Sequence, residues 1–265
     1  MNSAYAVQRG FTILEMLMAM AIFLIICAAM FELLDLSQKK YSSETQLTAA
    51  YQDARLSVDQ ILRDFNVSGY PPADLFSVPP SSSRYATYPV AWSPNYNPPL
   101  PCQIGTGGGG TCATPGDYDL IVETRLSTDA NVSWIWYHLD GTTLYRVVVP
   151  KSTGDPLAAA TSSTDKVAFL SNVMNNPGSA QLAQITAQYP SMFPGNQPQP
   201  IFQYTCDTPA GAVPCPSAGP YNAPRNIRDV EVTLIVMTPR RDIQTQGLKL
   251  VELNGMGHRV NPVNP

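Results

Sequence analysis

The longest apolar run of the chain lies close to its N-terminus. No charged residue occurs from Met16 to Phe31, and Phe11 to Leu14 extend the run on the other side of Glu15. Together these residues reach roughly the twenty that span a bilayer. A secretory signal peptide would have a basic start and a small-residue cleavage site after the run. Here a polar segment ending at Gly10 comes first and no such site follows, so we expect a retained membrane anchor.

The apolar run continues into a helical pattern. Neither Gly nor Pro occurs from Phe11 to Ser68. Apolar or small residues recur at steps of three and four, which places them on one face of an α-helix: Leu47, Tyr51, Ala54, Val58, Ile61 and Phe65. We expect one helix over 11–68, roughly 85–90 Å long at 1.5 Å per residue. Its first half would lie in the membrane and its second half would pack on a globular head.

The pattern changes after Gly69, where the predicted head, 69–265, begins. Five segments are rich in aromatic and β-branched residues, which favour strands: 117–123, 132–139, 142–149, 227–237 and 247–253. Asp140-Gly141 separates the second segment from the third, and this dipeptide is a strong hairpin signal. We expect at least four or five strands in one antiparallel sheet that packs on the second half of the helix. The predicted fold class is α+β.

Prolines and cysteines are concentrated in two parts of the head. Nine of the 25 prolines lie in 71–101 and ten in 177–224, so we expect irregular backbone in both stretches. Cys102 and Cys112 bracket a glycine-rich loop, and Cys206 and Cys215 bracket a second loop. Two local, loop-closing disulfides are the favoured interpretation, which indicates an oxidising compartment. Four free thiols, or a pairing of Cys102 with Cys206 or Cys215, are the alternatives.

Composition and motifs argue against several kinds of site. The net charge is −4, so no basic field would attract nucleic acid. Metal binding is not expected, because there is no C-x2-C spacing and the histidines are only His138 and His258. The glycine-rich 105–111 lacks the Lys-Ser/Thr of a phosphate loop. We therefore expect no catalytic residues, no metal and no cofactor.

The most informative motif surrounds Glu15, a carboxylate that is costly at bilayer depth. The string Arg9-Gly10-Phe11-Thr12-Ile13-Leu14-Glu15, followed by the apolar run, resembles the signal of type IV pilins and type II secretion pseudopilins. The resemblance implies that residues 1–10 are a leader, which the prepilin peptidase removes by cutting between Gly10 and Phe11. It also implies that the amine of Phe11 is methylated. Phe11 and Glu15 are four residues apart and share a helix face, so amine and carboxylate could neutralise each other within or between subunits.

A second, shorter resemblance suggests the type of subunit. The segment Tyr51-Gln52-Asp53-Ala54-Arg55, then Ile61-Leu62-Arg63-Asp64-Phe65 and Ser68-Gly69-Tyr70 is similar to the helix end of PilW-type minor pilins. It is similar, less closely, to minor pseudopilin J of type II secretion. The resemblance implies a minor pilin that helps prime a type IV pilus together with other minor and major pilins. The precursor would be a single-pass inner-membrane protein, and the mature chain part of a periplasmic or extracellular filament.

Three other functions stay open at this point. The chain could be a J-type minor pseudopilin, which has the same fold class but serves type II secretion. It could be a pilus-tip adhesin or surface-binding module whose proline-rich loops contact a surface. It could also be a periplasmic enzyme with an N-terminal anchor, although no residue pattern supports catalysis.

Overall fold

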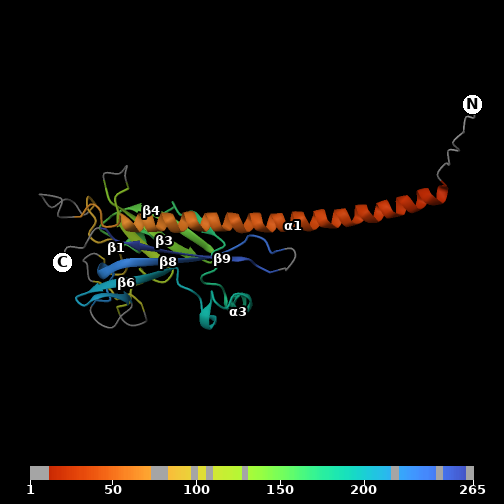
Figure 1. Cartoon of the computed structure of the whole chain (residues 1–265). Helices are drawn as coiled ribbons and strands as arrows, with labels where there is room; N and C mark the ends of the chain where they lie inside the picture. The colour runs from red at the N-terminus through yellow and green to blue at the C-terminus, as the bar shows by residue number, and fades with distance from the viewer. Residues whose placement is uncertain are drawn as a thin grey trace, which may run out of the picture.

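A computed structural model describes residues 12–72, 83–96, 101–105, 110–126, 131–215, 221–242 and 247–260. A long helix carries a β-rich head at one end and projects far beyond it at the other (Figure 1). The chain runs through α1 (Ile13–Asn66), β1 (Val90–Ala91), β2 (Asp119–Thr124), β3 (Ser133–Asp140), β4 (Thr143–Pro150), α2 (Pro156–Thr161), β5 (Val167–Ser171), α3 (Ser179–Gln188), β6 (Phe202–Thr208), β7 (Gly211–Cys215), β8 (Ile227–Met237) and β9 (Leu250–His258). Two short 3-10 turns, Pro194–Asn196 and Pro224–Asn226, complete the order. The α+β fold expected from the sequence is confirmed.

Helix α1 is continuous because nothing in its sequence interrupts it. Its 54 residues correspond to about 81 Å, and its ends lie inside the expected range of 11–68. Val67 caps the C-terminus, and Gly69 then turns the chain with a φ of 77°, which glycine adopts without steric cost. The amide of Gly69 donates to the carbonyl of Glu123 in β2, so the helix end is fixed to the sheet.

The face by which α1 packs on the head differs slightly from the predicted stripe. Its buried residues are Ala50, Ala54, Ser57, Val58, Ile61, Asp64 and Phe65. Tyr51 was expected in the stripe, but its side chain is 43% exposed, so that assignment is wrong. Ala50 lies at the contact instead, next to the predicted Ala54, because small side chains let the helix approach the sheets more closely than a tyrosine would.

The head contains two antiparallel sheets among the described residues, and the expectation of one sheet is wrong. The first has the order β1-β2-β3-β4-β5 and the second β7-β6-β8-β9. All five predicted strand segments are present, as β2, β3, β4, β8 and β9. The predicted hairpin is also confirmed, with Asp140 opposite Thr143 and Gly141 in the left-handed region at φ 59°.

The proline-rich stretches are less irregular than expected. The second one, 177–224, contains α3 and the β6–β7 hairpin, so the prediction of irregular backbone there is wrong. Pro214 lies in β7, which is an edge strand, where a missing N–H interrupts no ladder on its outer side. The first stretch, 71–101, has only the two-residue β1 among its described residues.

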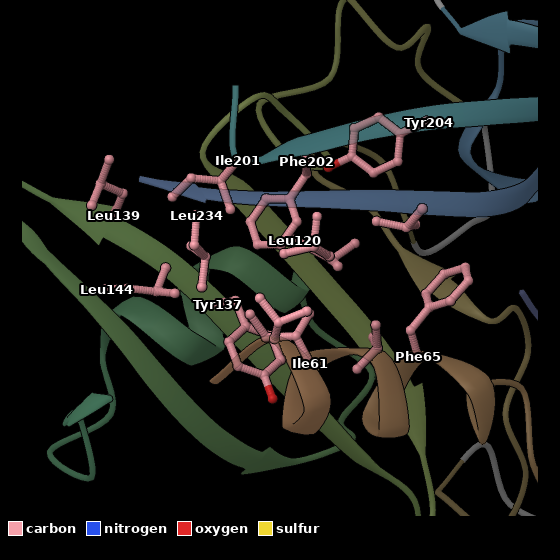
Figure 2. Close-up of a cluster of buried hydrophobic side chains, with 14 of the residues drawn as sticks. Ile61, Phe65, Leu120, Tyr137, Leu139, Leu144, Ile201, Phe202, Tyr204 and Leu234 are labelled. Atoms are coloured by element: carbon pink, nitrogen blue, oxygen red, sulfur yellow. The ribbon is translucent and has the colours of Figure 1, made fainter. Parts of the chain in front are cut away.

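The main core lies where α1 meets both sheets. Figure 2 shows Ile61 and Phe65 from the helix beside Leu120 and Tyr137 of the first sheet and Phe202 of the second. A second cluster covers the outer face of the first sheet and includes three tryptophans, Trp92, Trp134 and Trp136. The second half of α1 is thus part of the head's own core.

Candidate functional site

The first turn of α1 is closed by a reciprocal set of hydrogen bonds. The Thr12 hydroxyl accepts from the amide of Glu15 at 3.3 Å. The Glu15 carboxylate accepts from the amide of Thr12 at 2.9 Å and from its hydroxyl at 3.0 Å. This capping box satisfies amide groups that a helix start otherwise leaves unpaired. The spacing Thr-x-x-Glu before an apolar run is its sequence signature, so Thr12 could have been identified from the sequence as a functional partner of Glu15.

Glu15 has hydrogen bonds but no opposite charge beside it. Within the described part of the chain, its carboxylate is bonded only to Thr12 and forms no salt bridge. A carboxylate at a helix N-terminus interacts favourably with the positive end of the helix dipole. Gly10 and Phe11, the expected cleavage and methylation residues, lie outside the described residues. The pairing of Glu15 with the Phe11 amine therefore stays a prediction.

The first half of α1 is apolar and uncovered. Nearly all side chains from Thr12 to Phe31 are exposed, the exception being the partly covered Cys27. Burying one Leu, Ile, Phe or Met contributes about 1.5–3 kcal/mol, so this surface would be strongly stabilised by lipid or by other helices. Among the described residues, α1 is the one helix long and apolar enough to cross a membrane, judged by length and composition alone.

A buried polar cluster fixes the other end of α1 to the first sheet. The Asp64 carboxylate accepts from the hydroxyl of Tyr137 at 2.6 Å and pairs with Arg146 at 2.9 Å. Gln60 donates to its second oxygen at 2.8 Å. Burial, together with the charge of Asp64, raises the pKa of Tyr137 well above its usual value, so Tyr137 stays a proton donor. The helix is therefore held in one position relative to the head.

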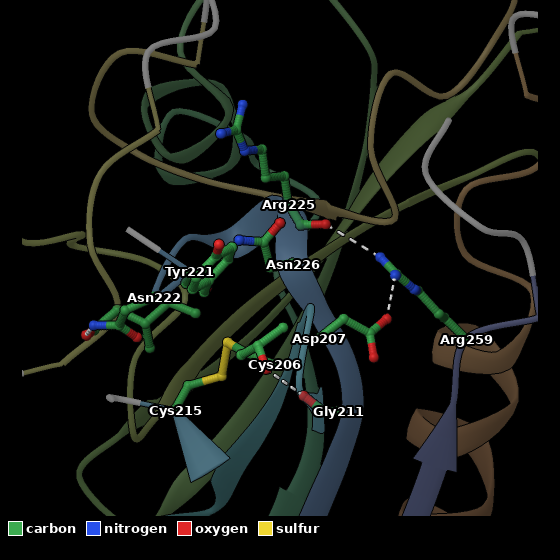
Figure 3. Close-up of a disulfide and its surroundings, with 11 residues drawn as sticks. Cys206, Asp207, Gly211, Cys215, Tyr221, Asn222, Arg225, Asn226 and Arg259 are labelled. Carbon is green, nitrogen blue, oxygen red and sulfur yellow. Dashed lines mark hydrogen bonds and ion pairs between the residues drawn. A yellow bond between two sulfur atoms is a disulfide. The ribbon is translucent and has the colours of Figure 1, made fainter. Parts of the chain in front are cut away.

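The two cysteine loops lie at neighbouring places on the head. The disulfides are Cys102–Cys112 and Cys206–Cys215, which are the local pairings that the sequence favoured. Figure 3 shows the second disulfide joining β6 and β7. The amide of Ile104 in the first loop donates to the carbonyl of Asn222, which follows the second, at 3.1 Å. Cys112 and Cys215 both line one cavity of about 580 Å³. The sequence indicated the pairings but not this convergence.

A second contact in the same region ties the end of β9 to the β6–β7 hairpin. The Arg259 guanidinium binds the carboxylate of Asp207 at 2.8 Å and the carbonyl of Arg225 at 3.1 Å (Figure 3). Arg228 also lies near Asp207, at 3.8 Å. These contacts stabilise the end of the head that lies farthest from the start of α1 (Figure 1).

Comparison with known families identifies the start of the chain. Residues 6–31 match the family described as the prokaryotic N-terminal methylation motif. The chain is a type IV pilin- or pseudopilin-like protein. No curated protein and no solved structure matches it. The match covers the end of the expected leader and most of the uncovered half of α1, and it leaves the type of subunit unresolved.

Pilin-like proteins are typically not enzymes. No group of three or more His, Cys, Asp or Glu side chains that could hold a metal ion occurs in the part of the chain that is described. His138 lies in β3 and contacts Asp119 at 2.7 Å. His258 is the last residue of β9 and contacts Asp229.

Proposed function

We propose that this chain is a minor pilin, of the PilW type, that helps prime assembly of a type IV pilus. In this proposal the prepilin peptidase cuts the inner-membrane precursor between Gly10 and Phe11 and methylates the amine of Phe11. The mature chain then joins other minor and major pilins in a filament outside the cytoplasm. The head contacts neighbouring subunits and does no chemistry.

One observation carries the proposal: the uncovered apolar half of α1 begins with a carboxylate that has no described counter-charge. Such a helix is incomplete on its own, because both its apolar surface and the charge of Glu15 require partners. Parallel helices of neighbouring subunits would cover the surface. The amine that cleavage creates on Phe11 of a neighbour would neutralise Glu15, which supports entry into a bundle rather than simple anchoring.

The capping box stabilises the Glu15 carboxylate before such a partner is present. While the subunit is alone in the membrane, Thr12 satisfies the Glu15 carboxylate with two hydrogen bonds. Hydrogen bonds lower the cost of placing the charge in an apolar environment, but they leave the charge uncompensated. Pairing with an amine would then be favourable because it removes the remaining cost.

The test is entry of Glu15→Ala into filaments in a deletion strain that carries single-copy variants. We expect the variant to be cleaved, which the mass of the mature chain reports, but to be absent from sheared filaments. Glu32→Ala is the matched control, because Glu32 is an exposed glutamate of the same helix outside the capping box. Normal entry of Glu15→Ala would refute the charge-neutralisation role.

The deletion strain itself separates the minor-pilin role from its alternatives. Loss of surface pili, restored by the wild-type gene, would support priming. Unchanged pili together with a defect in the secreted proteome would identify the chain as a J-type pseudopilin instead. Unchanged pili and secretion with lost surface attachment would identify an adhesin.

A further inference from the structure

The outer edge of β5 is exposed and makes no backbone hydrogen bond to another strand among the described residues. Unprotected edges present free backbone donors and acceptors to another chain, and proteins usually block them. At the other edges, β1 has only two residues, β7 contains Pro214, and the last residue of β9, His258, donates its amide to Asn66 of α1. β5 pairs with β4, and its residues 167–171 show no further backbone hydrogen bond within the described structure.

A hydrogen-bond ladder begins between β8 and the residues just after β5, but it does not continue along β5. Just after β5, the amide of Met174 donates to Ile235 of β8, and the amide of Met237 donates to Asn172. β8 ends at Met237, and the next residue, Thr238, donates its amide to Lys249 instead. Pro239 follows and has no N–H to offer. A strand added beside β5 would therefore extend the ladder that β8 begins.

The strand register identifies which backbone groups of β5 point outward. Asp140 and Thr143 close a two-residue hairpin, so odd-numbered residues of β4 bond to β3, as Lys151 does to Val132. Even-numbered residues of β4 then bond to β5, because bonding direction alternates along an antiparallel strand. Ala168 lies opposite Tyr145 and Ser171 lies opposite Thr143, and the register shifts by one residue between these two pairs. Both residues therefore face odd-numbered residues of β4, although they are three apart in the chain. The backbone groups of Ala168 and Ser171 consequently point away from β4.

A groove for side chains runs beside this edge. One part, of about 640 Å³, lies between the flank of α1 and the end of β5, with Ala49, Leu56 and Phe169 among its lining residues. A second part, of about 560 Å³, shares Gln60 and Phe169 with the first and reaches Val167. Leu56 is 68% exposed and Val167 61% exposed. Strand addition has this form in general, since backbone bonds provide affinity and pockets for alternate side chains provide specificity.

The charged residues that line the groove indicate which kind of peptide segment, the guest strand, it would bind. Its charged lining residues are Asp53, Arg146 and Asp165. Arg146 is already bound by Asp64. Asp53 and Asp165 have no side-chain partner in the described part of the molecule. A guest with Lys or Arg beside an apolar stretch complements two such carboxylates.

We propose that the β5 edge binds an extended segment of a different protein chain in the filament, apolar with a Lys or Arg at its end. This rests on the proposed function, because a filament subunit meets different neighbours side by side. The guest strand bonds to Ala168 and Ser171, places alternate apolar side chains against Leu56 and Phe169, and sets its basic residue near Asp53 or Asp165. The contact involves the head and is separate from the packing of α1 in the filament core.

The test is photo-crosslinking in filaments with benzoylphenylalanine placed at Leu56 of the full chain. The control position is Gln52, which is exposed on α1 and lies outside the groove. We expect a Leu56 adduct whose crosslinked peptide, identified by mass spectrometry, is an apolar segment with Lys or Arg from another protein. A peptide from a second copy of this chain, a peptide without a basic residue, or no adduct would each overturn the proposal.

Two further variants decide whether the adduct depends on strand addition. Ala168→Pro removes an outward N–H without breaking a bond to β4, and we expect it to reduce the Leu56 adduct at least tenfold. Ala168→Thr keeps the N–H and favours strands, so its adduct should equal that of the wild type. Asp53→Lys changes only an exposed charge and should also reduce the adduct. An unchanged adduct in both Ala168→Pro and Asp53→Lys would overturn the proposal.

The readouts also separate this proposal from the proposed function. Leader cleavage and filament entry of the variants are measured in the same samples. Normal entry with an unchanged adduct contradicts only the β5 contact. Normal entry of Glu15→Ala, by contrast, contradicts the assembly role of α1 and says nothing against the β5 edge.

Discussion

At the scale of single residues, a buried ion pair holds the segment 83–96 on the outer face of the first sheet. Lys151 and Glu123 form a salt bridge at 2.5 Å, and their side chains are 2% and 0% exposed. Glu123 also accepts from the amide of Thr87, the hydroxyl of Tyr96 and the indole of Trp134. Lys151 donates in addition to Tyr85 and Thr87. Every polar group of the pair is therefore satisfied.

Removing one member of this pair should destabilise the head strongly. Glu123→Gln leaves the Lys151 ammonium buried without a counter-charge, which costs about 3–5 kcal/mol. Replacing both members, as in Glu123→Leu with Lys151→Met, removes both charges but leaves the donors of Thr87, Tyr96 and Trp134 without their acceptor, so it should also destabilise the head. The measurement is urea unfolding of the full chain in detergent, followed by tryptophan fluorescence. Equal stability of the wild type and Glu123→Gln would contradict the importance of the pair.

Buried tyrosines predict a loss of stability at high pH. Burial, helped by the charge of Asp117, raises the pKa of Tyr118 to about 12. Burial also raises the pKa of Tyr137 and of Tyr204 well above the usual value. In the unfolded chain these groups lose their protons near pH 10. Between pH 10 and 12 the folded state therefore binds more protons, so stability is retained below pH 10 and falls as the pH rises through this window.

The urea midpoint at pH 9 and at pH 11.5 tests this prediction. We expect a lower midpoint at pH 11.5, and a smaller decrease in Tyr118→Phe, which removes one of the raised groups. An equal decrease in the variant and the wild type would show that Tyr118 does not contribute.

Which of these residues could be predicted depends on the distance between partners along the chain. Glu15 and Thr12 are three residues apart, so a motif contains both. Glu123 is 28 residues from Lys151, and Asp64 is 82 from Arg146. Such pairs depend on the strand register and on where α1 lies against the sheet, and neither is encoded in a local pattern.

At the scale of elements, the docking of α1 on β9 depends on two glycines of this strand, Gly255 and Gly257. A Cβ atom at Gly255 would lie 2.6 Å from Val58 Cγ1 and 2.7 Å from Leu62 Cδ1. Gly257 is similarly close to Phe65, at 2.9 Å. Real Cβ atoms do not approach other carbons this closely, so the two glycines determine how near the helix can lie.

We therefore expect Gly255→Ala to destabilise the chain by about 1–3 kcal/mol through overpacking. Leu62→Ala in the same chain should recover part of this loss, because it removes one of the two clashing side chains. The control is Gly178→Ala, whose Cβ would meet no atom within 4 Å. The comparison takes the denaturant midpoints of five chains: the wild type, Gly255→Ala, Leu62→Ala, the double variant and Gly178→Ala. An additive double variant would show that the two positions do not interact.

The elements that the sequence revealed are those with a strong local signal. The aromatic and β-branched segments of β2, β3, β4 and β8 and the Asp140-Gly141 turn meet this condition. β6 and β7 lie among prolines that obscured them, and the five-residue β5 is held mainly by its pairing with β4. The division into two sheets also escaped prediction, because it depends on which strands pair across long separations.

At the scale of the whole molecule, one helix serves two environments, and the boundary between them can be located. Contacts with the head begin at Ser43, which donates to Asp242 at 2.8 Å, and at Glu44, which lies 3.5 Å from Lys249. The first buried helix residue is Ala50. Residues before Ser43 thus add apolar surface and no described head contact, whereas residues from Ala50 onward belong to the core.

Two truncated chains test this boundary. A chain that begins at Lys39 keeps all described helix contacts with the head, so we expect a soluble monomer in size-exclusion chromatography without detergent. Its stability should lie within about 0.5 kcal/mol of that of the full chain in detergent, as for changes away from the core. A chain that begins at Leu56 lacks Ala50 and Ala54 and opens the core between the sheets, so it should aggregate or unfold. Aggregation of the longer chain as well would mean that the head depends on the apolar half of α1, and the two halves would then not be separable.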